Sequence, residues 1–269
     1  MEKNKELVQQ FWNQASCGET LYLHGNSEKE AFLAQEKTRY GLEPYIINFA
    51  DFLKYKGKKV LEIGVGLGAD HQKFAESGAD LYGIDLTERA IYNTAKRLSI
   101  FGLFSNLKQG DAENLDFQDC SFDLVYSWGV IHHSPNTQKA IDEIWRVTNF
   151  GGEAKIMIYH THSLVGYMLW LRYALGRLRP FTSLKEIYDR YLESPGTKAY
   201  SLAEAKVMFN RFRQVEISCV LTHGDLLESD AGQRHKGLLL RVAKYFFPRV
   251  LLKKILHGHG LFMLIKAIK

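Results

Sequence analysis

Three glycines, Gly64, Gly66 and Gly68, follow a short apolar run and stand directly before a segment of helical period. Glycine permits a tight turn and a close approach of the backbone to a ligand. The helix N-terminus that follows presents free N–H groups and a positive dipole. The turn fits more than one class of cofactor, because Gly64, Gly66 and Ala69 also match the dinucleotide fingerprint GxGxxG/A.

Carboxylates stand at the predicted ends of three successive strands. Glu62 lies two residues before Gly64, so on a strand both point to the same side. A carboxylate there repels a pyrophosphate and attracts an ammonium, which favours S-adenosylmethionine over NAD. Asp85 can accept both ribose hydroxyls of either cofactor, each charge-assisted bond contributing roughly 1.5–3 kcal/mol. Asp111 can accept from an adenine amino group while the backbone N–H of Ala112 faces the ring.

Two groups of residues are candidate general bases. His132 and His133 follow a predicted strand, FDLVYSW, at the carboxyl edge where α/β sheets bind ligands. Tyr159 and His160 follow another strand, EAKIMIY, at the same edge. An imidazole with an unperturbed pKa near ~6.5 can take a proton at neutral pH. Contacts within the loop, a helix cap or exposure to solvent are the structural alternatives for these side chains.

Alternating elements must position these residues. Between Val60 and Tyr159, short apolar runs alternate with segments of helical period, which predicts βαβ units around a parallel sheet. The expected order is β-α-β-α-β-β-α-β. The first part of the chain predicts helices over residues 6–14, 28–40 and 43–53.

The rhythm changes after Tyr159. Helical segments precede two late strands, VEISCVL and LFMLIKAI, which suit an antiparallel edge of the sheet. We expect a single domain. It comprises a helical N-terminal segment (1–55), a cofactor-binding core (56–160), and insertions with the final two strands (161–269).

Composition sets limits on location and partners. Of 269 residues, 46% are hydrophobic and 24% charged, as in globular proteins. Three scattered cysteines argue against a disulfide framework or structural zinc and predict a reducing cytoplasm, and no ligand spacing indicates another metal. No stretch approaches the ~20 apolar residues of a membrane span.

The charge is unevenly distributed. No acidic residue follows Asp230, whereas nine lysines and arginines do. Such a basic tail can meet anionic lipid, an acidic substrate or nucleic acid, although a solvated helix surface is the commoner explanation. Nucleic acid is not expected, because aromatic residues do not interleave with the basic ones in a recognisable binding module.

Five motifs between residues 58 and 159 resemble the class I S-adenosylmethionine-dependent methyltransferases, in particular a small-molecule branch similar to the ubiquinone/menaquinone C-methyltransferases. They are VLEIGVGLG, YGIDLT, GDAENLDF, FDLVYSWGVIHH and EIWRVTNFGGEAKI. The resemblance implies a doubly wound, seven-stranded Rossmann-like α/β sheet with a reversed last strand. One departure, VTNFGG in place of the usual Lys-Pro-Gly-Gly turn, affects no expected binding residue. The implied cofactor residues are Glu62, Gly64, Gly66, Gly68, Asp85, Leu86, Asp111, Ala112, Glu113, Ser127 and Trp128.

In similar methyltransferases the N-terminal segment folds over the cofactor as a lid, so we expect Tyr22 to close the methionine end. Helical insertions after the fifth and sixth strands are expected to cap the substrate. Dimer contact or contact with an anionic membrane surface are further expectations for them.

The expected reaction is in-line methyl transfer to a small molecule. Oxygen is slightly favoured over nitrogen, carbon or sulfur as the acceptor. Catalysis should be mainly positional, because alignment supplies ~7–11 kcal/mol whereas a base adds a factor of ~10²–10⁴. An NAD-dependent oxidoreductase and a catalytically silent cofactor-binding subunit are the alternatives.

Overall fold

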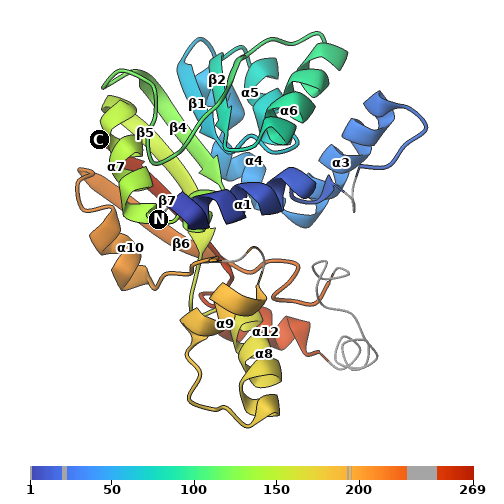
Figure 1. The fold of residues 1–269 in the computed structure, drawn as a ribbon, viewed down its shortest axis with the longest axis vertical. Coiled ribbons are helices and arrows are strands. Elements are labelled where there is room, and N and C mark those ends of the chain that lie inside the picture. The colour runs from blue at the N-terminus through green and yellow to red at the C-terminus, as the bar shows by residue number, and fades with distance from the viewer. Residues whose placement is uncertain (1, 20–22, 193, 195, 229–246) are drawn as a thin grey trace.

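A mixed sheet of order β3-β2-β1-β4-β5-β7-β6 runs through the computed structural model, which describes residues 2–19, 23–192, 194, 196–228 and 247–269 (Figure 1). Within the described chain this sheet has seven strands. Strands β1 to β5 are parallel, and β7 lies antiparallel between β5 and β6, which confirms the predicted reversal. The strands are β1 Lys59–Ile63, β2 Asp80–Asp85, β3 Asn106–Gln109, β4 Phe122–Trp128, β5 Thr148–Tyr159, β6 Gln214–Val220 and β7 Phe262–Ile268.

Helices cover both faces of the sheet. On one face, Ile46 and Phe74 pack on β1, β2 and β4, and on the other Ile141 and Phe209 complete a second apolar cluster. No helix among the described residues is long and apolar enough to cross a membrane. The helices are α1 Glu2–Gln14, α3 Glu28–Leu42, α4 Tyr45–Ala50, η1 Phe52–Tyr55, α5 Ala69–Glu76, α6 Glu88–Ile100, η2 Ile131–His133, α7 Thr137–Val147, α8 Leu164–Tyr173, η3 Leu175–Arg177, α9 Leu184–Tyr191, α10 Leu202–Met208 and α12 Arg249–Ile255.

The single helix expected over residues 43–53 is two elements. Asp51 adopts a left-handed conformation (φ 52°, ψ 54°) that ends α4, and η1 starts at the next residue. Aspartate tolerates this conformation better than most residues. The break lets Phe52 and Tyr55 turn inward against Phe74, at ring-centroid distances of 4.7 and 6.2 Å.

Asp70, in the first turn of α5, ties the N-terminal helices to the sheet. Its buried carboxylate accepts hydrogen bonds from Arg39 (2.9 and 2.5 Å) and from the hydroxyls of Tyr40 (3.0 Å) and Tyr126 (2.9 Å). Burial alone would raise the pKa of Asp70, but the Arg39 guanidinium and the hydrogen bonds hold it below its ordinary value. One side chain therefore joins α3, α5 and β4.

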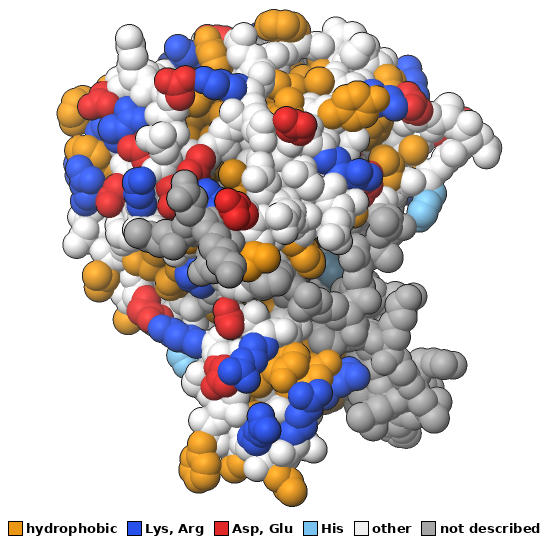
Figure 2. All heavy atoms as spheres, viewed as in Figure 1, with side chains coloured by type: hydrophobic (Ala, Val, Ile, Leu, Met, Phe, Trp, Pro, Cys, Tyr) orange, Lys and Arg blue, Asp and Glu red, His pale blue; other side chains and the backbone are white. Residues whose placement is uncertain are grey.

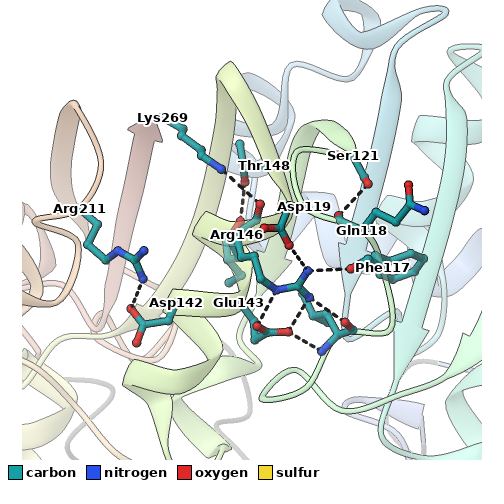
Figure 3. A network of polar contacts seen from close by, with 12 residues as sticks. Phe117, Gln118, Asp119, Ser121, Asp142, Glu143, Arg146, Thr148, Arg211 and Lys269 are labelled. Atoms are coloured by element: carbon teal, nitrogen blue, oxygen red, sulfur yellow. Dashed lines mark hydrogen bonds and ion pairs between the residues drawn. The ribbon is translucent and has the colours of Figure 1, made fainter.

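Arg146 of α7 fixes the loop between β3 and β4 (Figure 3). Its guanidinium donates to the carbonyls of Leu115 (2.8 Å) and Phe117 (2.7 Å) and pairs with Glu143. Glu143 in turn accepts from the Leu115 N–H at 2.8 Å. This network holds the chain that directly follows Asp111 against α7.

A smaller group of elements lies beside the sheet: α8, η3 and α9 (Figure 1). Ser163 caps α8 by accepting from the Gly166 N–H and lies 2.6 Å from the Tyr188 hydroxyl. The buried Asp225 accepts from the N–H groups of Val165 (3.0 Å) and Leu261 (2.8 Å). The base of this group is thus fixed to β7.

We expect Asp70→Asn to lower the free energy of unfolding by about 3–5 kcal/mol, because it leaves the Arg39 guanidinium without its carboxylate. Urea denaturation at pH 7 measures this. The lowered pKa of Asp70 means that its contribution is complete above its unfolded value, about 3.9, and is lost as pH falls through the folded value. Asp119→Asn, at a carboxylate with 74% exposure that pairs with Arg146, should cost less than about 1 kcal/mol. Equal losses for both variants would contradict this assignment.

Candidate active site

A cavity of about 1130 Å³ lies at the carboxyl edge of the parallel strands. The glycine turn and the ends of β1, β2, β4 and β5 form its floor, and residues of α1 and α8 contribute to its walls. Pockets for one drug-sized ligand typically measure roughly 300–1,000 Å³. This cavity therefore has room for a cofactor together with a second molecule.

The glycine turn is shaped for close approach by a ligand. Gly64 (φ 85°) and Gly68 (φ 74°) are packed, because a Cβ there would lie 2.1 Å from Val130 and 2.9 Å from Thr94. Gly66 (φ 54°) differs, since a Cβ would meet nothing within 4 Å. It also lines the cavity. The backbone at Gly66 thus faces open space at the end of the turn.

Glu62 lines the cavity but is buried, with its carboxyl 2.9 Å from Nδ1 of His71. Ser105 donates to the Leu81 carbonyl (2.9 Å), so its oxygen accepts from Nε2 of His71 at 2.8 Å. Nδ1 of the neutral ring is then an acceptor, and Glu62 supplies the proton. Burial and the nearby Asp70 raise the pKa of Glu62, while burial lowers the pKa of His71 to about 3. Without a ligand this pair is neutral, which differs from the charged carboxylate that the sequence suggests.

Asp85 and Asp111 reach the cavity from the ends of β2 and β3. Asp85 accepts from the Thr87 N–H (3.0 Å), the Thr87 hydroxyl (2.8 Å) and the Gly66 N–H (3.2 Å), which orient its carboxylate beside the glycine turn. Asp111 accepts from the Glu113 N–H at 2.9 Å and pairs with Lys5 of α1 at 2.5 Å. Both carboxylates thus line the cavity, Asp85 beside the glycine turn and Asp111 beside Lys5.

Most of the predicted residues line this cavity together. They are Glu62, Gly64, Gly66, Gly68, Asp85, Leu86, Asp111, Ala112, Trp128, His133 and Tyr159.

Four predicted residues point elsewhere, so the geometry supports no direct contact with a ligand. The Ser127 hydroxyl donates to the Ile63 carbonyl (3.1 Å), and Glu113 accepts from the Asn136 N–H (2.7 Å). His160 is buried with Nδ1 3.3 Å from the Gly260 carbonyl. His132 is fully buried between His133 and Tyr159, and neither ring nitrogen has a hydrogen-bond partner among the described residues. Tyr22 lies outside the described residues.

His133 is the histidine of the pair that reaches the cavity. Its Nδ1 lies 2.9 Å from the Ser194 hydroxyl and 3.2 Å from that of Thr197. Thr197 donates its own proton to the Ser194 carbonyl (2.7 Å), so toward His133 it can only accept. When Nδ1 carries the proton and donates to these hydroxyl oxygens, the lone pair of the neutral ring is on Nε2. Burial, with a smaller effect of Lys198, lowers the pKa of His133 to about 3.

Two cationic residues at the site did not emerge from the sequence. Lys5 pairs with Asp111, and Arg39 pairs with Asp70 while its guanidinium lies 5.9 Å from the Trp128 ring centroid. Both line the cavity. Each is far along the chain from its partner. Lys5 precedes the apolar Val8 by three residues, so both can lie on the same face of an amphipathic helix. This spacing is a weak local indication that Lys5 faces the interior.

The far part of the cavity is apolar. Met168 and Leu169 of α8 line the cavity together with Leu261 and Phe262, and Arg172, Thr222 and His223 are polar members of the lining. The Tyr159 ring lies 5.8 Å from that of Phe262. Trp12 of α1 contacts His133 edge-on at 5.5 Å. The cavity thus has a polar half at the strand ends and an apolar half under α8.

Comparison with known proteins agrees with this geometry. A family model described as a methyltransferase domain matches residues 61–156. Over residues 61–156 the chain is therefore similar to a methyltransferase domain. The match contains the glycine turn, the three carboxylates and both η2 histidines.

Similarity to individual methyltransferases covers part of their length. The chain is 35% identical over 147 residues to phosphoethanolamine N-methyltransferase 2 of Caenorhabditis elegans, covering 54% of this chain and 33% of that protein. It is 30% identical over 159 residues to demethylmenaquinone methyltransferase of Tropheryma whipplei, covering 58% and 65%. The chain thus spans between about a third and two thirds of these relatives.

Solved structures share the fold. Phosphoethanolamine N-methyltransferase 2 of Haemonchus contortus, in complex with S-adenosyl-L-methionine, aligns with a TM-score of 0.60 at 17% identity, covering 97% of this chain and 60% of that one. A Thermotoga maritima methyltransferase aligns with a TM-score of 0.53 at 16% identity, covering 97% and 99%. The seven-stranded arrangement is therefore the methyltransferase fold.

We expect Glu62→Gln to weaken binding of S-adenosylhomocysteine by about 10–100-fold, the equivalent of one charge-assisted hydrogen bond. A glutamine amide still donates to Nδ1 of His71, so the melting temperature should stay within about 3 °C of wild type. Isothermal titration calorimetry and thermal unfolding measure the two effects. Glu62→Ala, which also removes the donor, should lower both affinity and stability. Unchanged affinity in Glu62→Gln would show that this carboxyl does not meet the ligand.

Proposed function

We propose that the protein transfers the methyl group of S-adenosylmethionine to a small-molecule acceptor. One observation supports this proposal: a single cavity contains the open backbone at Gly66 and a large space with apolar lining. The carboxyls of Glu62, Asp85 and Asp111 line the same cavity. A nucleoside with a cationic amino-acid end suits the first part, and an acceptor suits the second.

The residues that would hold the cofactor divide along its length. Asp111 and the Ala112 N–H would face the adenine, Asp85 the ribose hydroxyls, and Glu62 the ammonium of the methionine end. Arg39, which lines the cavity and is paired with Asp70, would face the carboxylate of that end. The bound cofactor supplies an electrophilic methyl group on a positively charged sulfur. An NAD pyrophosphate would instead meet the carboxyl of Glu62 at the rim of the turn.

His133 would accept a proton from the acceptor. In the tautomer whose Nδ1–H donates to Ser194 or Thr197, the unprotonated Nε2 would be the atom that takes this proton. A charged imidazolium is costly in an apolar cavity, but its formation coincides with the loss of a positive charge from the sulfur. The net charge of the cavity is then unchanged across the reaction. This balance supports an acceptor that must lose a proton, and oxygen is the acceptor atom that we favour slightly.

Binding provides the first test. We expect S-adenosylhomocysteine to bind with a dissociation constant at or below about 100 µM and NADH to show no binding at the same concentrations. Calorimetry on the full chain measures both. Tight binding of NADH without binding of S-adenosylhomocysteine would overturn the proposed function, whereas binding without any methyl transfer would indicate a silent cofactor-binding subunit.

We expect His133→Gln to lower methyl transfer to a phenolic acceptor by about 10²–10³-fold, the usual contribution of a general base. Its affinity for S-adenosylhomocysteine should remain unchanged. Transfer of tritium-labelled methyl groups to a panel of phenols, amines and hydroquinones measures this. His132→Leu is the matched control, because the adjacent ring is buried without polar partners among the described residues. Turnover within threefold of wild type in His133→Gln would remove this residue from the mechanism.

A further inference from the structure

The end of α8 carries large apolar side chains in solvent. We define the tip as residues 171–181, which include the C-terminal end of α8, η3 and the following turn. Leu178 is 90% exposed and Phe181 99%, while Leu171 and Leu175 are about half exposed. Figure 2 shows hydrophobic side chains at the extreme end of this projecting lobe. Because burying large apolar side chains stabilises a protein, a group of them in solvent marks a candidate interaction surface.

The tip is a built structure. The N–H groups of Arg177 and Arg179 both donate to the Ala174 carbonyl (3.2 and 2.8 Å), and that of Leu178 donates to Leu175 (2.9 Å). The Trp170 indole closes the turn by donating to the Thr182 carbonyl at 2.9 Å. Leu178 is left-handed (φ 57°), a strained conformation for a leucine that a surrounding structure must hold. The surrounding hydrogen bonds therefore hold Leu178 in a strained backbone conformation while its side chain stays exposed to solvent.

Positive charge surrounds the exposed side chains. Residues 164–183 contain no aspartate or glutamate, but they contain Arg172, Arg177 and Arg179. Within the described residues none of these arginines forms an ion pair; Arg172 and Arg177 lie over the Tyr173 ring, each 5.2 Å from its centroid. Lysine and arginine side chains flank apolar ones over this lobe in Figure 2. The surface thus combines convex apolar side chains with arginines that pair with no carboxylate in the part of the chain that the structure describes.

We propose that the tip docks on the surface of an anionic lipid bilayer. Leu178 and Phe181 enter the interface between headgroups and acyl chains, and Arg177 and Arg179 bind lipid phosphates beside them. A protein partner would require a groove to receive two separate points, whereas a bilayer receives any convex apolar group. A nucleic acid would satisfy the arginines but would leave the leucine and phenylalanine in water.

Docking would place the cavity against the lipid. Leu171, Arg172 and Gly176 belong to the tip and also line the cavity, whose apolar half lies under α8. An acceptor dissolved in the bilayer can then reach the apolar half without crossing water. This second step, which rests on the proposed function, assigns the acceptor to the class of membrane-resident amphiphiles.

Vesicle co-sedimentation of the full chain tests the docking without any need for activity. We expect binding to vesicles of phosphatidylcholine with 30% phosphatidylglycerol, and at least tenfold weaker binding to phosphatidylcholine alone. Leu178→Ser/Phe181→Ser should weaken binding about tenfold or more, and Arg177→Gln/Arg179→Gln should do the same and remove the salt dependence. The matched control is Leu53→Ser/Phe104→Ser, which changes the same residue types at 80% and 81% exposure elsewhere on the surface.

Three results would overturn the proposal: no binding to the anionic vesicles, equal losses in the tip and control variants, or loss in the arginine variant alone with equally tight binding to duplex DNA. Melting temperatures of all variants identify any that fail to fold. Calorimetry with S-adenosylhomocysteine keeps the two proposals separate. A chain that binds the nucleoside but no vesicle loses only the docking proposal, and a chain that binds vesicles but no nucleoside loses only the proposed function.

Discussion

A buried carboxylate beneath the glycine turn is the constraint on which the site depends. Asp70 follows Gly68 by two residues, and its bonds reach Arg39 and Tyr40 on α3 and Tyr126 on β4. Because breaking a buried ion pair is costly, α3 cannot leave the sheet without exposing or orphaning these groups. The same bonds hold Arg39 over Trp128 at the cavity wall. The hydrogen bonds of Asp70 thus position three elements: the helix that follows the turn (α5), the strand β4 and the N-terminal helix α3.

Three ionisable groups of the cavity share a second property, which is that burial or a partner of opposite charge offsets their charge. Glu62 keeps its proton for His71, and the lowered pKa of His133 keeps that ring uncharged. Asp111 is neutralised by Lys5. Such a cavity accepts one cation at low cost, because Glu62 can then release its proton. It is less suited to an anionic cofactor, because the described arginines near the glycine turn, Arg39 and Arg97, are both paired with carboxylates.

The sequence predicts those site residues whose position depends only on where a strand ends. The carboxyl ends of parallel strands meet at one edge, so Glu62, Asp85 and Asp111 could be grouped from their positions alone. It could not separate His132 from His133, because the single turn of η2 decides which ring enters the cavity. Pairs such as Lys5 with Asp111 join residues more than a hundred positions apart. Their geometry follows from packing between elements, which periodicity does not report.

The family match covers the residues that form the polar part of the cavity and ends before the helices that line its apolar part. The match ends at residue 156, within β5, and contains the turn and carboxyls that suit the cofactor. The elements over the apolar half, from Leu164 onward, follow it. Since methyl transfer needs alignment more than reactive side chains, the placement of the acceptor largely decides the rate. In the proposed function, α8 and its neighbours would therefore select the acceptor. Asp225 fixes the start of α8 to β7, and from there the helix reaches outward to the exposed tip.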